Sequence, residues 1–120
     1  MKRTGPTNIV LRKTIRELRR TASRHDAKIW KAVAEILEAP SRSRPAVNLS
    51  RINRNTCEGD IVIVPGKVLA SGTLDHKVKI AAIAFSKKAL EKIRAVGGEA
   101  IHILELVKEN PKGSNVKIIR

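Results

Sequence analysis

The chain has 120 residues, of which 25 are Lys or Arg and 11 are Asp or Glu, so its formal net charge at pH 7 is +14. One domain is expected at this length, and 42% hydrophobic residues can supply one core. So large a positive excess favours a polyanionic partner. A membrane partner is disfavoured, because no apolar run approaches the roughly 20 residues needed to span a bilayer and no signal peptide is visible. We therefore expect a cytoplasmic protein that binds nucleic acid.

Few residues could hold a metal ion or stack on bases. Cys57 is the single cysteine, and the three histidines lie far apart in the sequence, so we expect no disulfide, no metal site and no cofactor. Trp30 and Phe85 are the only aromatic residues. Because aromatic rings are so scarce, binding of single strands by base stacking is disfavoured. Recognition of phosphates and of the shape of folded RNA or duplex remains as the expected binding mode.

The positive charge is concentrated in the first half of the chain. Residues 1–54 hold 14 Lys or Arg and 4 Asp or Glu, whereas residues 55–120 hold 11 and 7. After a flexible basic tail over residues 1–8, Asn8 is expected to cap a helix that runs to about Ser23. One side of this helix is apolar, with residues such as Leu11 and Leu18. The opposite side carries Arg12, Lys13, Arg16, Arg19, Arg20 and Arg24. A solvated polar face is the alternative, but such faces usually mix charges, so we favour RNA contact.

A second helix is expected from Asp26, as its cap, to about Glu38, with Trp30 in the core. Pro40 ends this helix. Residues 40–55 are too irregular for a definite element and predict an extended basic arm that orders against RNA. A plain surface linker is the alternative, but guanidinium groups suit phosphate oxygens. The arginines of this arm are Arg42, Arg44, Arg51 and Arg54.

Residues 56–120 have an α/β pattern. A β-branched run predicts a buried strand over residues 60–65, which Pro65-Gly66 ends in a turn with Lys67 on the surface. A second strand is expected over residues 77–85, with its first half at the rim of the sheet. Ser86 then caps a helix that Gly97-Gly98 stops. A further strand is expected at 100–103 and a last one at 116–119, while residues 104–109 fit either a continued strand or a short helix.

Two catalytic interpretations are weak. Gly66-Lys67 matches part of a phosphate-binding loop motif. However, the spacing from Gly59 is wrong, and Val68 stands where a metal-binding hydroxyl is needed. Asp75, His76 and Ser86 supply the residue types of a hydrolytic triad without a nucleophile elbow. A small phosphate-handling enzyme built from these residues and Lys67 remains the alternative class, and we expect no catalytic residue.

Six segments resemble the archaeal large-subunit ribosomal protein L18e family in the same order. They are IWKAVA at 29–34, VNLSRI at 47–52, VIVPGKVLASGTL at 62–74, KIAAIAFS at 79–86, VGG at 96–98 and NPKGSNVKIIR at 110–120. The resemblance as a whole covers nearly the whole chain from Thr7. The resemblance implies a component of the large subunit that contacts rRNA and neighbouring ribosomal proteins. It also implies an irregular superhelix of β-β-α turns, related to the C-terminal domain of bacterial ribosomal protein L15.

We therefore expect an α/β protein with one domain over residues 9–120. It comprises N-terminal helices at 9–39, the arginine-rich arm at 40–55 and an α/β core at 56–120. Its expected function is structural: it is a monomer outside the ribosome and scaffolds large-subunit rRNA through phosphate contacts. A free-standing RNA or DNA architectural protein is the alternative binding class. The candidate RNA-binding residues are Arg12, Lys13, Arg16, Arg19, Arg20, Arg24, Arg42, Arg44, Arg51, Arg54 and Lys67.

Overall fold

Five parallel strands form the centre of the protein in the computed structural model, which describes residues 9–40 and 44–120. The helices are α1 (Ile9–His25), α2 (Lys28–Glu38), α3 (Leu49–Asn55), α4 (Lys87–Ala95) and α5 (Ile103–Glu109). The strands are β1 (Ala46–Asn48), β2 (Ile61–Leu69), β3 (Lys79–Phe85), β4 (Glu99–His102) and β5 (Val116–Ile118). The expected α/β class is confirmed, and β2, β3 and α4 follow one another in the expected β-β-α order.

The strand β2 holds the sheet together because it pairs with three other strands. It pairs with β3 on one side, and β3 pairs with β4 at the edge. On its other side, β5 pairs with the first part of β2 and β1 pairs with the last part, with Ile61 opposite Val116 and Lys67 opposite Ala46. A parallel sheet is normally buried on both faces, which explains the continuous apolar runs of β2 and β3.

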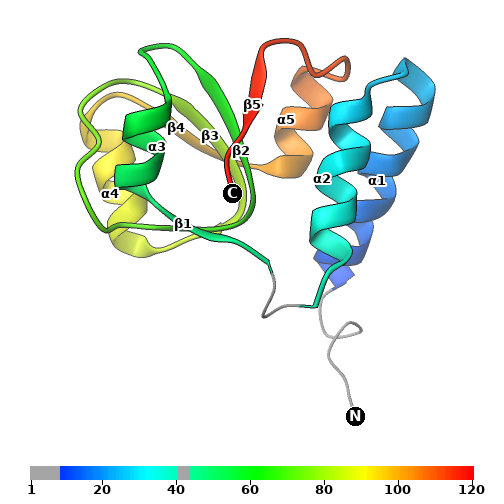
Figure 1. The fold of residues 1–120 in the computed structure, drawn as a ribbon, viewed down its shortest axis with the longest axis horizontal. Coiled ribbons are helices and arrows are strands. Elements are labelled where there is room, and N and C mark those ends of the chain that lie inside the picture. Colours follow the sequence, from blue (N-terminus) through cyan, green and yellow to red (C-terminus); the bar gives the residue numbers. More distant parts are fainter. Residues whose placement is uncertain (1–8, 41–43) are drawn as a thin grey trace.

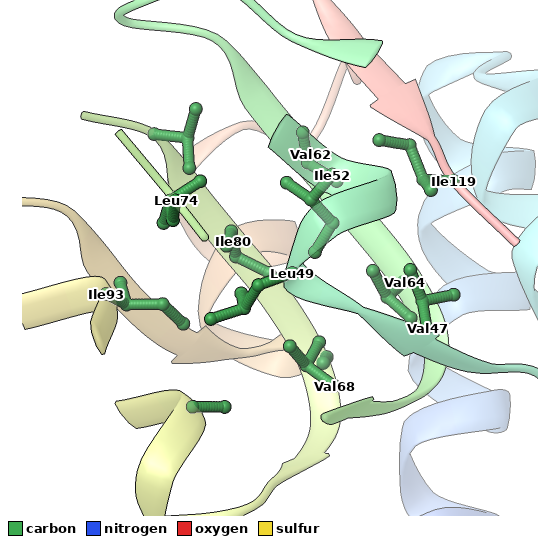
Figure 2. Close-up of a cluster of buried hydrophobic side chains, with 13 residues drawn as sticks. Val47, Leu49, Ile52, Val62, Val64, Val68, Leu74, Ile80, Ile93 and Ile119 are labelled. Carbon is green, nitrogen blue, oxygen red and sulfur yellow. The ribbon is translucent and has the colours of Figure 1, made fainter. Parts of the chain in front are cut away.

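Helices cover both faces of this sheet (Figure 1). Alternate residues of β2 point to opposite faces, so Val62 and Val64 enter one hydrophobic cluster while Ile63 enters the other. The first cluster is covered by α3 and α4, and Figure 2 shows Leu49 and Ile52 of α3 over the side chains of β2 and β3. The second cluster is covered by α2 and α5, with α1 outside them. The helices α1 and α3 therefore lie on opposite sides of the sheet.

The helix α1 runs two residues further than expected, which changes the start of α2. Asp26 has a φ of +52° and lies in the turn, and the backbone N–H of Ala27 donates to the carbonyl of Ala22. This hydrogen bond is the one that closes a helix ending on a left-handed residue. The expectation that Asp26 caps α2 is therefore wrong, because Ala27 occupies the cap position without a side-chain hydrogen bond. Asn8, the expected cap of α1, lies outside the described residues.

Trp30 is fully buried, as expected, and belongs to the cluster beneath α1 and α2. Its indole Nε1–H donates to the carbonyl oxygen of Pro111 at 2.7 Å. A buried indole needs such a partner, because an unpaired donor in the core costs free energy. The hydrogen bond ties α2 to the segment before β5, which lies 81 residues further along the chain.

The described part of the expected arm, residues 44–55, is mostly regular structure. Residues 46–48 form β1 and residues 49–55 form α3. Val47, Leu49 and Ile52 are buried in the cluster under α3 and α4. The expectation of an extended arm without a core is therefore wrong over this segment. Local propensity did not reveal these elements, because β1 is three residues long and gains its hydrogen bonds from β2.

The dipeptide Pro65-Gly66 lies inside β2, so the expected turn is wrong. The pairing of β2 with β3 is irregular between Val64 and Lys67, at the position of these two residues. Proline cannot donate to a strand ladder and is tolerated at such a bulge. Beyond the bulge, the N–H of Lys67 donates to the carbonyl of Pro45 and the strand continues to Leu69.

The remaining elements follow the sequence more closely, with one reversal. Ser86 caps α4 by accepting a hydrogen bond from the N–H of Ala89, and Gly97, with a φ of +79°, follows the end of the helix as expected. Residues 104–109 form a helix. The first half of β3 is buried and its last residues are more exposed, contrary to expectation. The reason is β4, which pairs only with Lys79 to Ala82.

Candidate nucleic-acid interface

The outward side of α1 carries five exposed basic residues, which we call the α1 basic face. The buried residues Leu11, Thr14, Leu18 and Thr21 mark the opposite side of this helix. At 100° per residue, the basic side chains lie around the direction that points away from these residues. They are Arg12, Lys13, Arg16, Arg20 and Arg24.

The α1 basic face contains little negative charge. Glu17 is the only acidic residue of α1, and its Oε1 lies 3.3 Å from a terminal nitrogen of Arg20. Exposed pairs of this kind contribute at most about 1 kcal/mol, so Arg20 can exchange Glu17 for another anion. Within the described residues, Arg12, Lys13 and Arg16 form no ion pair. This face can therefore neutralise several phosphates.

Arg19 differs from its neighbours because its guanidinium group is already paired. Its Nε donates to Oε2 of Glu38 at 3.0 Å, and a second nitrogen donates to the other carboxylate oxygen. These hydrogen bonds to Glu38 raise the pKa of Arg19 above its usual value. This bidentate pair joins α1 to α2, so Arg19 has a structural contact that the sequence did not reveal.

The arginines of residues 41–55 do not form one surface. Arg44 is half-buried and donates to the carbonyls of Leu37 and Ala39 at the C-terminal end of α2.

Arg51 and Arg54 are exposed on the outward side of α3, while Arg42 lies outside the described residues. Lys67 is exposed on β2, as expected for a surface lysine.

The outward side of α4 adds basic residues that were not among the sequence-based candidates. Lys87, Lys88 and Arg94 are exposed there, and Glu91 is the only acidic residue of the helix. The side chain of Lys92 instead donates to the carbonyls of Ala70 and Gly72, both at 2.8 Å. The signal was present in the sequence, because residues 87–95 carry four basic residues, but the larger charge excess of the first half of the chain obscured it.

Three of the residues considered for catalysis have structural contacts. The ring of His76 lies between Asp75 and Thr56, with Nδ1 2.9 Å from Oδ1 of Asp75 and Nε2 2.7 Å from the hydroxyl of Thr56. The His76 hydrogen bond lowers the pKa of Asp75. Thr56 also donates to the carbonyl of Ile52, so its proton is engaged in closing the end of α3. Ser86 caps α4, and its hydroxyl accepts from Ala89, so the contacts of Asp75, His76 and Ser86 are structural.

No group of three His, Cys, Asp or Glu side chains in residues 9–40 and 44–120 could hold a metal ion. No helix in the described part of the chain is both long enough and apolar enough to cross a membrane.

The hydrogen bond and burial of His102 predict that the stability of the protein depends on pH. Its Nδ1 accepts a hydrogen bond from the N–H of Leu104 at the start of α5, which requires an unprotonated ring nitrogen. Burial lowers the pKa of His102 below 6.5. The unfolded chain therefore binds a proton more readily, and the free energy of unfolding should fall as the pH decreases below about 6.5. A helix cap contributes about 1 kcal/mol, which sets the scale of the loss.

Urea unfolding at about pH 7.5 and pH 5.5 measures this effect. The matched variant is His102→Asn, since Asn caps a helix and does not titrate in this range. We expect a smaller pH dependence in the variant. An unchanged pH dependence would show that His102 does not contribute to it.

The amino-acid sequence has counterparts among known proteins. The family model for "Ribosomal protein 60S L18 and 50S L18e" matches residues 1–120. The chain belongs to this ribosomal protein family. The resemblance seen in the sequence is thereby confirmed, and the L18e family is a structural one with no enzymatic activity.

Individual relatives of this L18e-family chain are archaeal proteins of nearly the same length. A protein of Methanothermobacter thermautotrophicus, "Large ribosomal subunit protein eL18", is 51% identical over 113 residues, which cover 94% of this chain and 93% of the relative. The protein of the same name from Pyrobaculum aerophilum is 48% identical over 116 residues, covering 97% and 95%. That of Methanoregula boonei is 49% identical over 114 residues, covering 95% and 94%.

Proposed function

We propose that this chain is a structural constituent of the large subunit of the cytoplasmic ribosome and binds large-subunit rRNA mainly through phosphate contacts. Family membership supports the ribosomal role. The observation that carries the RNA contact is the α1 basic face, where five exposed cations share one helix side with a single carboxylate at its margin. Such a surface attracts the RNA backbone and releases its condensed counterions.

The structure divides the candidate residues by how available their charges are. Arg12, Lys13, Arg16 and Arg24 have no ion pair within the described residues, and Arg20 has a weak one. Arg51, Arg54 and Lys67 are exposed elsewhere on the protein. Arg19 and Arg44 are engaged with α2, so their part in RNA binding is secondary to their structural contacts.

Contacts to phosphates and sugars dominate over base stacking in this proposal. Trp30 is fully buried and Phe85 is packed against the cluster under α3 and α4. No other aromatic ring of the Phe, Trp or Tyr type is present in the sequence. A duplex or a folded RNA surface, recognised by its shape and its phosphates, therefore suits this protein better than an unpaired strand does.

We expect RNA binding to depend steeply on salt. Six neutralised phosphates would lower the affinity about a thousandfold between 50 and 200 mM salt. The measurement is a filter-binding titration of the purified protein against transcribed large-subunit rRNA of Methanothermobacter thermautotrophicus. An affinity that does not change with salt would contradict the phosphate contacts. Failure of the protein to sediment with large subunits in its own cells would contradict the ribosomal role.

A further inference from the structure

Exposed basic side chains gather at two opposite ends of the protein. One group is the α1 basic face. The second group, which we call the α3–α4 basic face, consists of exposed residues on the outward sides of α3 and α4. Its members are Arg51, Arg54, Lys87, Lys88 and Arg94. In Figure 1, α1 lies at one end of the longest axis and α3 and α4 lie at the other, along a dimension of 38 Å.

The two faces point away from each other because the sheet separates them. The buried side chains of α3 and α4 belong to the cluster on one face of the sheet, and those of α1 belong to the cluster on the other. Residues opposite the buried side of each helix must therefore point outward in opposite directions. A straight duplex that lies along α1 cannot also contact the outward side of α4.

Ion pairs neutralise several of the cations that lie between these two faces. Lys79 of β3 pairs with Glu109 of α5, and Lys117 of β5 pairs with Asp60 at 2.8 Å. Arg19 joins α1 to α2 in the same way. In contrast, no residue of the α3–α4 basic face pairs with an acidic side chain of the described chain. Nine of the ten cations of the two faces thus have no acidic partner in the described chain, although other exposed cations without such a partner, such as Lys67 and Lys108, lie elsewhere.

The stability of α4 does not explain the lysines of the second face. Lys87 and Lys88 are the first two residues of α4, where the partial charge of the helix end is positive. Basic residues at this position destabilise a helix. A polyanion bound on the outward side of α4 removes this repulsion.

We propose that the protein joins two separate double-helical segments of rRNA, one on the α1 basic face and one on the α3–α4 basic face. The inference rests on the proposed function and extends it. A protein that binds RNA with only one of its sides needs no second cationic face. Joining two helices fixes their relative position, with the rigid α/β core as the spacer between them.

Hydroxyl-radical footprinting on large-subunit rRNA tests this proposal with two matched variants. One variant combines Arg12→Gln, Lys13→Gln and Arg16→Gln, and the other combines Lys87→Gln, Lys88→Gln and Arg94→Gln. Each removes three positive charges from exposed helix positions and keeps a residue that favours helix. Wild-type protein should protect two separate helical segments. Each variant should lose protection of one segment, a different one in each case, and keep the other.

The outcomes separate this proposal from the proposed function. If the α4 variant leaves every protected segment and the salt dependence unchanged, then the bridging proposal is wrong while RNA binding by α1 stands; the α3–α4 basic face then faces solvent or a protein. If wild-type protein protects no segment, then both proposals are wrong. Circular dichroism and thermal unfolding of each variant verify that it folds.

A second measurement needs no variant. Wild-type protein is mixed with two RNA duplexes of about 20 base pairs, one labelled with a donor dye and one with an acceptor dye. Bridging predicts energy transfer that rises with protein concentration and falls again when the protein exceeds the RNA. Binding seen by anisotropy without energy transfer would overturn the proposal.

Discussion

Neutralising Arg12, Lys13 and Arg16 together should lower the affinity for large-subunit rRNA about a hundredfold at 0.1 M salt. These three cations lie on the α1 basic face and have no ion pair within the described residues. Each phosphate contact that is lost reduces the slope of log affinity against log salt by about 0.9, so the slope should fall by about 2.7. The variant carries Gln at all three positions, and the measurement is the same filter-binding titration.

A matched control distinguishes position from net charge. Arg19→Gln, Lys79→Gln and Lys117→Gln also remove three positive charges, but each of these side chains is paired with an acidic residue of the protein. We expect this control to change the salt slope much less and to lose some stability. Equal effects of the two triple variants would show that RNA binding depends on the total charge and that the α1 basic face has no special part in it.

Replacing Gly66 with Ala should lower the free energy of unfolding by about 3 kcal/mol or more. A Cβ atom at Gly66 would lie 2.0 Å from the carbonyl oxygen of Pro45. That oxygen belongs to the backbone and accepts the N–H of Lys67, so it cannot move aside without breaking the entry into β1. The chain before α3 would be displaced, and the buried Val47 and Leu49 would lose their packing.

Urea denaturation measures the loss, with Gly59→Ala as the control. Gly59 has a φ of +87°, and a Cβ atom there would have no neighbouring atom within 4 Å, so alanine meets backbone strain without a clash. That strain costs about 1–2 kcal/mol. We therefore expect Gly66→Ala to be clearly the more damaging substitution. A loss at Gly66 no greater than at Gly59 would mean that β1 can shift without cost.

Local sequence signals predicted the elements whose ends depend on nearby residues. Ser86 as a cap and Gly97-Gly98 as a stop define α4, because both act on backbone groups within one helical turn. The apolar periodicity of residues 9–23 was sufficient for α1, and the β-branched run after Asp60 was sufficient for the start of β2. These signals need no information about distant parts of the chain.

The predictions that were wrong concern segments whose structure depends on residues far away in the chain. Pro65-Gly66 is typical of a turn, but here the bulge between β2 and β3 accepts the proline and the carbonyl of Pro45 requires the glycine. Residues 46–55 have no strong local preference, and they form β1 and α3 because β2 offers hydrogen bonds and the sheet offers an apolar surface. A single sequence does not show which strand will lie beside which.

Composition and local patterns were enough to predict a strongly basic α/β protein, the family that it resembles and the residues that could contact phosphates. The folded chain shows which of those cations are available. Arg19, Lys79 and Lys117 are paired with acids that lie 19, 30 and 57 residues away in the chain. Charge is a property of a residue, but an ion pair requires two residues within about 4 Å, and only the folded chain brings such distant residues together. The same folding placed the free cations of α1 and of α3 and α4 on opposite sides of the sheet.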